Sequence, residues 1–353
     1  MTTALAVVAT VLALSLLIVI HELGHYAAAV RFGMRVERFS VGFGPVVGSF
    51  RRGGTEFAVS ALPLGGYVKI AGMSPGDRVD PADPSAYANQ PAWRRFLFIL
   101  AGPAMNYVLA IAIAAILLST VGLRGPDPAA RVGQVLPGGP AEQAGLRTGD
   151  LVVAVDGEAV DGWPAMVARF QAAPGRTLHL DVERPGAGGA AAERVAITIT
   201  PRDAGGVGRV GIGQAPAMLR ATGLEALASA LQRTNALAVA QFAAFGAVFR
   251  GGQGAELSGP IGIGQQLVAA AHEGAPPFLA LVWQISLVLA ILNLLPVPAL
   301  DGGRLVFLAI EMVTRRRVNE RVEDIVHMVG FVALLALLLG VTVFGDLARL
   351  LRR

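Results

Sequence analysis

The stretch "IVIHELGHYAAAVRFG", residues 18–33, places two histidines and a glutamate at the end of an apolar run that is long enough to cross a bilayer. Crossing the hydrocarbon core takes about 20 helical residues at a rise of ~1.5 Å each. One ionisable group in such a helix costs on the order of 2.5–3.5 kcal/mol by insertion scales. Three of them together therefore need a partner that compensates their burial.

Zinc is the partner that the spacing in "HELGH" favours. His21 and His25 are four residues apart, so both imidazoles lie on one helix face and can bind one metal ion. Glu22 lies beside the open side of such a metal, where it can act as general base toward water whose pKa zinc lowers to about 7. The alternative is a helix end whose histidines merely lie at the membrane interface. The position inside an apolar run favours the zinc site.

A catalytic zinc needs a third protein ligand and keeps one position for water. The chain has no cysteine, and "LNLLPVPALDGGRLVF", residues 292–307, offers Asp301 as a carboxylate ligand. Pro296 and Pro298 interrupt the helix there, and irregular backbone at membrane depth is tolerated only where protein or a water-filled cavity covers it. Asp301 is also a candidate N-cap of the next helix, and the two roles do not exclude each other.

The composition is that of a membrane protein. Of the 353 residues, 54% are hydrophobic and only 15% are charged, which is too apolar for a typical soluble domain. Four charge-free stretches predict four spanning helices, at residues 2–20, 96–123, 278–300 and 328–345. The first stretch lacks the basic start and the small-residue cleavage site of a signal peptide, so we expect it to be retained.

The arginines predict the topology. They gather between the first two spans and between the last two, so the positive-inside rule places both loops in the cytoplasm. The N-terminus, residues 124–277 and the C-terminus are then outside, although arginines near the C-terminus argue mildly against this. The basic residues form no stripe with interleaved aromatics, so nucleic acid is not an expected partner despite the net charge of +4.

The long outer segment begins with a small α+β unit. "VGQVLPGGPAEQAGLRTGDLVVAVDGEAV", residues 132–160, alternates short β-branched runs with glycine and proline turns, and two further strands follow at "TLHLDVERPG" and "RVAITITPR". Over residues 130–213 this unit resembles a PDZ domain, which can bind an extended peptide as an added strand. The alternative is a purely structural module.

A helix of low charge follows this unit. Residues 223–252 have an apolar face at helical period, but Glu225 and Arg233 interrupt the first half. These charges favour a helix lying in the membrane interface over a fifth span. We expect it to lead into a loop at residues 257–263.

These motifs together resemble the site-2 protease family of intramembrane zinc metalloproteases, peptidase family M50, and specifically its bacterial RseP-like branch with a single PDZ domain. "HELGH" in the first span and "NLLPVPALDGG" in the third carry the resemblance. It implies one Zn2+ per chain, bound by His21, His25 and Asp301, with Glu22 as the catalytic base. It also implies that Asn293 helps to orient the substrate.

The resemblance extends to the loop after the first span. "RVERFSVGFGP", residues 35–45, and "TEFAVSALPLGGYVKI", residues 55–70, alternate like paired strands around the turn "RRGG". In the family this region is a membrane-associated β-hairpin whose edge holds the substrate, which implies substrate contacts at Gly42, Phe43 and Gly44. In the second span "AGPAMN", residues 101–106, predicts close helix packing.

The sequence therefore predicts a polytopic α-helical membrane protein with four transmembrane helices, a membrane-associated β-hairpin and one extracytoplasmic α+β PDZ-like domain. The expected parts are the first span with HExxH (1–33), a cytoplasmic-side loop with the hairpin (34–93), the second span (94–123), the PDZ-like domain (124–215), an interfacial helix and loop (216–277), the third span with its broken segment (278–314), and the fourth span with the C-terminus (315–353).

The function that the resemblance implies is intramembrane proteolysis in the bacterial inner membrane, with the HExxH motif near the cytoplasmic face. The expected partners are the lipid bilayer and single-span membrane proteins of the anti-sigma factor or remnant signal peptide type. The chain would cut them within or near their spans, after an upstream site-1 protease has trimmed them. The alternatives are a non-proteolytic PDZ scaffold or chaperone, and a zinc transporter. A transporter is disfavoured because the ligands converge on one site and the halves show no repeat.

Overall fold

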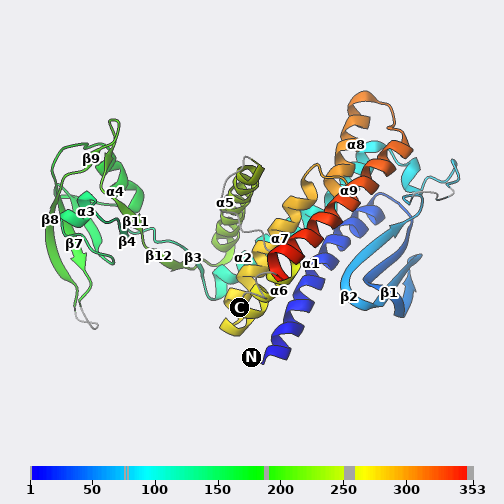
Figure 1. The fold of residues 1–353 in the computed structure, drawn as a ribbon, viewed down its shortest axis with the longest axis horizontal. Coiled ribbons are helices and arrows are strands. Elements are labelled where there is room, and N and C mark those ends of the chain that lie inside the picture. The colour runs from blue at the N-terminus through cyan, green and yellow to red at the C-terminus, as the bar shows by residue number, and fades with distance from the viewer. Residues whose placement is uncertain (1, 75–76, 78, 187–190, 250–258, 348–353) are drawn as a thin grey trace. The chain divides into compact units, whose positions relative to one another are not determined.

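The chain divides into two compact units in the computed structural model, which describes residues 2–74, 77, 79–186, 191–249 and 259–347 (Figure 1). The first, here the helical unit, comprises Met1–Leu117 and Thr222–Arg353. The second, here the inserted unit, comprises Leu118–Ala221. The candidate catalytic residues all belong to the helical unit.

Four helices of the described part are long and apolar enough to cross a membrane, which confirms the predicted number of spans. They are α1 (Thr3–Arg31), α2 (Ala92–Thr120), α7 (Ala275–Leu294) and the stretch Arg321–Asp346, which combines α9 (Glu320–Gly340) with the π-helical η3 (Val341–Leu347). Several extend beyond the charge-free stretches, because a helix continues through charged residues whose long side chains can reach the interface. "HELGH" therefore lies inside α1.

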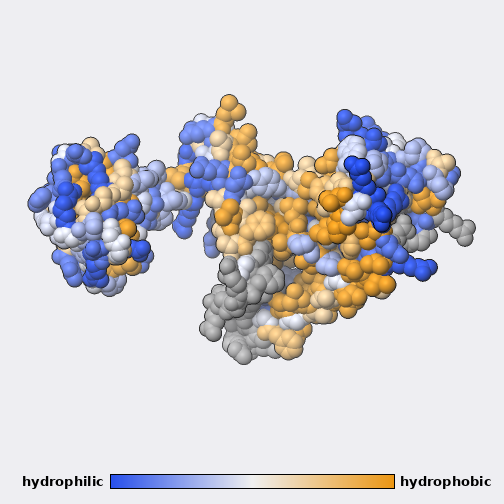
Figure 2. Space-filling model, turned by 90° about the horizontal axis from the view of Figure 1, so that it is seen from above, coloured by the Kyte–Doolittle hydropathy of each residue, from blue (hydrophilic) through white to orange (hydrophobic). Residues whose placement is uncertain are grey.

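Apolar side chains gather on the surface of the helical unit (Figure 2). Examples on α1 and α9 are Leu12, which is 63% exposed, and Leu337, which is 61% exposed. Exposed apolar surface of this extent is costly in water. This surface fits a protein that is embedded in a lipid bilayer.

Two further helices of the helical unit follow the inserted unit in the sequence and precede α7. Helix α5 (Gly223–Phe249) occupies the stretch expected to be interfacial, and α6 (Pro260–Glu273) follows it. The loop predicted at 257–263 is wrong from Pro260 onward, while residues 257–258 lie outside the described part. Helix α6 begins with a proline, Pro260, and the Asp346 carboxylate stabilises this start because it accepts hydrogen bonds from the backbone N–H groups of Gly259 and Gly262, at 3.1 and 3.0 Å. A partner so distant in the chain leaves no local signal.

Strands β1 (Val36–Arg52) and β2 (Thr55–Ile70) form an antiparallel hairpin around Gly53 and Gly54. The hairpin curls further than the sequence predicted. Residues 38–41 of β1 pair with residues 66–69 of β2, and the same four residues also pair with residues 56–59. In this second pairing the residue numbers of the two segments rise together. Arg38 donates to Glu56 at 2.9 Å across this second pairing and holds the pKa of that carboxyl below its usual range. The base of the hairpin packs on α1, α2 and α8 (Asp301–Thr314) through a buried cluster of Ala29, Met34, Val36, Ile70, Phe98, Ile99, Leu305 and Leu308.

The inserted unit is a small α+β fold. Its main sheet has the strand order β6–β5–β7–β8, and Met166 and Phe170 of α4 join the sheet's buried face in one core. Its elements are β3 (Leu123–Pro126), β4 (Val132–Val135), α3 (Pro140–Gln143), β5 (Leu151–Val155), β6 (Glu158–Ala159), α4 (Gly162–Gln171), β7 (Leu178–Arg184), β8 (Glu193–Ile199), β9 (Arg202–Asp203), β10 (Gly208–Arg209), β11 (Ile212–Gln214) and β12 (Pro216–Leu219). The first and last strands, β3 and β12, pair with each other, so both ends of the unit meet in one ladder.

Candidate metal centre

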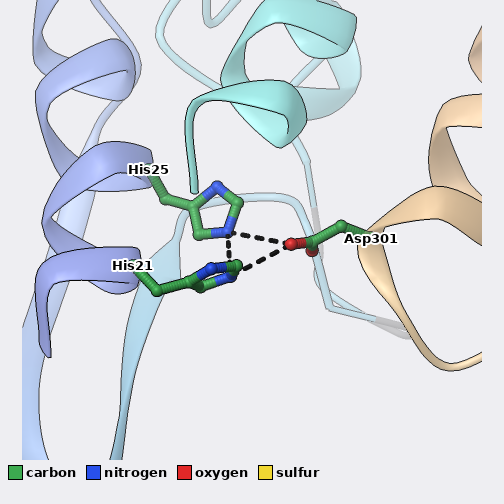
Figure 3. Close-up of side chains that lie close together, drawn as sticks. All are labelled: His21, His25 and Asp301. Atoms are coloured by element: carbon green, nitrogen blue, oxygen red, sulfur yellow. Dashed lines mark hydrogen bonds and ion pairs between the residues drawn. The ribbon is translucent and has the colours of Figure 1, made fainter. Parts of the chain in front are cut away.

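Three side chains that the sequence separates converge in the helical unit (Figure 3). His21 and His25 project from one face of α1, and Asp301 faces them from the start of α8. The Nε2 atoms of the two histidines are 3.1 Å apart, and Asp301 Oδ2 lies 3.0 Å from His21 Nε2 and 3.5 Å from His25 Nε2. Both histidines are buried. The three residues form a group that could hold a metal ion.

The separations of the three donor atoms fit zinc. Ligands at about 2.05 Å in a tetrahedral arrangement lie roughly 3.3 Å from one another, which is the middle of the observed range. Asp301 Oδ2 is buried and accepts no hydrogen bond from a described residue, so a bound cation would satisfy it. Two imidazoles and one carboxylate are also a donor set that zinc takes in catalytic sites.

The turn after α7 delivers Asp301 to this position. Helix α7 ends at Leu294, and α8 begins at Asp301 with Leu300 as its N-cap, so the capping role considered for Asp301 is wrong. A Cβ on Gly302 would lie 1.9 Å from the carbonyl oxygen of Leu295, so this close turn requires glycine. As the first residue of a helix, the Asp301 carboxylate is also stabilised by the helix dipole.

Helix α2 supports both histidines from behind. His25 Nδ1 donates to the carbonyl oxygen of Phe98 at 2.9 Å, which leaves its Nε2 lone pair directed toward Asp301. Asn106 Nδ2 lies 3.5 Å from His21 Nδ1, and Asn106 itself is buried. Between these contacts, a Cβ on Gly102 would come within 2.3 Å of His25 Nε2 and 2.8 Å of His21 Nε2. Only glycine leaves room for the two rings.

Sequence reasoning assigned Gly102 and Asn106 to helix packing alone. The two residues are four apart, so they share one face of an apolar helix. A glycine and an amide on one such face are the signal that could have placed them at the site. The Phe98 carbonyl carries no such signal, because backbone acceptors are independent of residue type.

Glu22 follows His21 on α1 and is half-buried. A Cβ on Gly66 of β2 would lie 3.6 Å from Glu22 Cγ, so the glutamate lies against the hairpin. Two turns nearer the start of the same helix, Ser15 Oγ donates to the carbonyl oxygen of Pro63 in β2. Strand β2 therefore runs beside the helix that carries "HELGH".

The remaining predicted residues make other contacts. Phe43 is 46% exposed and stacks on Tyr67, with ring centroids 6.1 Å apart, while Gly42 and Gly44 have φ of +87° in the curled part of β1. Asn293 is half-buried in the last turn of α7, and its side chain makes no hydrogen bond within the described part of the chain. Among the described residues, these four make no hydrogen bond or ring contact with His21, His25 or Asp301.

Comparison with known proteins identifies the family. The chain matches peptidase family M50 over residues 9–337. Three relatives bear the name "Putative zinc metalloprotease". The one from Nostoc sp. is 32% identical over 349 residues, covering 94% of this chain and 93% of the relative. Those from Brucella suis and Clostridium acetobutylicum are each 30% identical, covering 95% and 96% of this chain and 93% and 96% of their own lengths. The chain belongs to peptidase family M50, the site-2 protease family, and is a membrane zinc metalloprotease.

Proposed function

We propose that this chain is an intramembrane zinc metalloendopeptidase of the RseP-like branch that cleaves single-span membrane proteins within or near their spans. The observation that carries the proposal is the convergence of His21 and His25 of a spanning helix with Asp301 at mutual distances of 3.0–3.5 Å, with Glu22 next to His21 in the sequence. A purely structural role would not require that two imidazole nitrogens and one buried carboxylate oxygen converge at one point.

His21, His25 and Asp301 would hold the zinc in this proposal. Zinc bound there supplies Lewis acidity toward a peptide carbonyl and lowers the pKa of water at the site to about 7. Glu22 takes the proton from the attacking water and returns it to the leaving amine. Phe98 and Asn106 orient the two imidazoles from the other side.

Asn106 fits this role after one rotation of its amide. If His21 uses Nε2 as a ligand, its Nδ1 carries the hydrogen and needs an acceptor. Asn106 Oδ1 is buried without a partner among the described residues, while its Nδ2 faces His21 Nδ1. A half-turn of the amide would place Oδ1 opposite the Nδ1–H group and satisfy both atoms.

The hairpin offers a way to present an extended substrate. Cleavage requires the scissile peptide to leave its helix, and an added strand would keep its backbone groups hydrogen-bonded. The segment 66–70 of β2 pairs with β1 on one side, and Glu22 lies beside Gly66. Gly42, Phe43 and Gly44 would then contact the substrate from the curled part of β1, and Asn293 from the end of α7.

The inserted unit would be a PDZ-like domain on the extracytoplasmic side of the bacterial inner membrane, with the zinc near the cytoplasmic face. Its α+β composition and the pattern "PGGPAEQAGLRTGDLVVAVDG" support this assignment. We propose that it excludes substrates with bulky outer domains, so that cleavage follows trimming by a site-1 protease. The substrates would be anti-sigma factors or remnant signal peptides, cut in regulated intramembrane proteolysis.

The test is a comparison of wild type with Glu22→Gln, both purified and reconstituted in vesicles with a labelled single-span peptide that lacks an outer domain. Wild type should cleave the peptide. Glu22→Gln should retain one zinc per chain and lose at least about 100-fold in rate, because the ligands remain while the base is gone. Undiminished cleavage by Glu22→Gln would overturn its role, and no cleavage by zinc-loaded wild type across a panel of such peptides would favour the scaffold alternative.

A further inference from the structure

His327 of the fourth span lies against the turn that presents Asp301. Its Nδ1 accepts a hydrogen bond from the backbone N–H of Ala299 at 3.0 Å. Its Cε1 lies 3.2 Å from the place where a Cβ on Gly303 would be, and its ring centroid is 5.8 Å from that of Phe307. One imidazole thus contacts both the turn and the start of α8.

Ala299 is the residue of this turn that most needs support. Its φ is +78°, a left-handed conformation that residues other than glycine rarely adopt. Such conformations persist only where the surroundings fix them, and they cluster at functional sites. Ala299 is two residues before Asp301, so a change of its backbone would redirect the carboxylate.

Helix α9 approaches the same turn at a second point. A Cβ on Gly330 would lie 2.2 Å from Pro298 Cβ and 2.8 Å from the Pro298 carbonyl oxygen. His327 and Gly330 are three residues apart and therefore share one face of α9. This face contacts two successive residues of the turn. Gly330 lets the helix come close to Pro298, and His327 accepts the hydrogen bond from Ala299.

The ring of His327 is not held there by its other nitrogen. Because Nδ1 accepts from Ala299, Nε2 carries the hydrogen, and it is buried with no hydrogen-bond partner in the described part. Glu323 Oε1 lies 4.0 Å from it, beyond hydrogen-bond distance. A buried N–H without a partner is unfavourable, so the hydrogen bond from Ala299 is the polar contact that explains the position of the His327 ring.

We infer that His327 is a positioning residue for the metal centre: its bond to the Ala299 N–H holds the left-handed turn that directs Asp301 at His21 and His25. The inference rests on the proposed role of Asp301 as a ligand. The inference gives the fourth span a role in the geometry of the site, although none of the three proposed ligands lies on that span.

The experiment compares three substitutions in the full-length purified protein. Asparagine carries its Oδ1 near the position of the histidine Nδ1, so His327→Asn keeps an acceptor for Ala299. Glutamine carries its oxygen near the position of Nε2, so His327→Gln is polar but misplaced, and His327→Leu has no acceptor. Met328→Leu, at an exposed neighbour on α9, is the control.

Zinc affinity is measured by chelator competition, and ligand geometry by the visible spectrum of the Co2+-substituted protein. We expect His327→Leu and His327→Gln to weaken zinc binding about five- to tenfold and to alter the Co2+ spectrum, while His327→Asn and Met328→Leu match wild type. Equal affinity and spectra in all variants would overturn the inference, as would a His327→Asn defect as large as that of His327→Gln. If His327→Leu does not fold, the asparagine–glutamine contrast still decides. Failure of wild type to bind zinc at all would instead refute the proposed metal site.

Discussion

Gly102 of α2 and His25 of α1 are in contact at a point where even a methyl group does not fit, since a Cβ on Gly102 would lie 2.3 Å from His25 Nε2. Gly102→Ala should therefore displace the imidazoles and lower zinc content and peptide cleavage at least about tenfold. Gly264→Ala in α6 is the matched control, because a Cβ there meets open space. Metal analysis of both proteins checks this, and a fully zinc-loaded, active Gly102→Ala would contradict the contact.

A second prediction concerns Asp301, the proposed third ligand. Asp301→Ala should lower both zinc occupancy and cleavage, because its Oδ2 is the carboxylate atom that faces both histidines. Asp203→Ala should change neither, since Asp203 lies in the inserted unit and accepts a turn hydrogen bond from Gly206. Zinc per chain and the cleavage rate are measured side by side. Full zinc occupancy in Asp301→Ala would remove Asp301 from the ligand set.

The four spans and the hydrogen-bonded hairpin were predictable because each follows from local patterns of apolar residues and turns. The histidine pair was predictable for the same reason, since a helix brings residues four apart together. The Asp301 turn was partly predictable, because two prolines mark the break in the helix while its direction depends on packing against α9.

What the sequence could not predict are contacts made by chain segments far apart. The start of α6 depends on Asp346, 87 residues after Gly259, and the support of His25 depends on a backbone carbonyl of another helix. The second pairing of residues 38–41 with 56–59 also has no local signal, because it arises from the curl of both strands.

The proposed topology can be tested with cysteines, since the chain has none. Single cysteines at three exposed positions, Arg51, Ala192 and Arg316, report on the hairpin, the inserted unit and the loop before α9. In intact cells an impermeant thiol reagent should label Ala192→Cys and leave the other two unlabelled until the membrane is permeabilised. Labelling of Arg51→Cys and Arg316→Cys alone would invert the proposed orientation.

The inserted unit should depend on one buried ion pair. Asp150 has no exposed side-chain surface and accepts two hydrogen bonds from Arg184, at 2.9 and 2.8 Å. Asp150→Ala removes the carboxylate partner of Arg184, which keeps only its bond to the Gly145 carbonyl oxygen, and should destabilise the unit by about 3–5 kcal/mol. Arg194→Ala breaks an exposed pair with Glu183 and should cost less than about 1 kcal/mol. Hydrogen exchange of the β5 and β7 amides in the full-length protein measures both, and equal protection in the two variants would contradict the ranking.

The proposed exclusion role of the inserted unit predicts a change of selectivity on its removal. Because Pro126 of β3 and Pro216 of β12 are paired, residues 127–215 can be replaced by a short Gly-Ser linker that joins adjacent strand ends. The shortened protein should cleave a trimmed single-span substrate at a rate close to that of wild type, and should also cleave an untrimmed one that wild type rejects. Both substrates are compared in the same vesicles. Loss of trimmed-substrate cleavage in a folded, zinc-loaded protein would make the unit a required docking site.

The separation of the ligands along the chain sets the order in which the centre can form during synthesis. His21 and Asp301 are 280 residues apart (301 − 21), yet their side chains end 3.0 Å from each other. At translation rates of about 5–20 residues per second, the histidines precede Asp301 by roughly 14–56 s. A nascent chain that has inserted only α1 and α2 therefore holds the two histidines and the glutamate of the proposed site, without the carboxylate that would complete the ligand set. In the proposed mechanism, the complete metal site and peptide hydrolysis require Asp301, which lies in the last sixth of the chain, so the protease would stay inactive while it is being made.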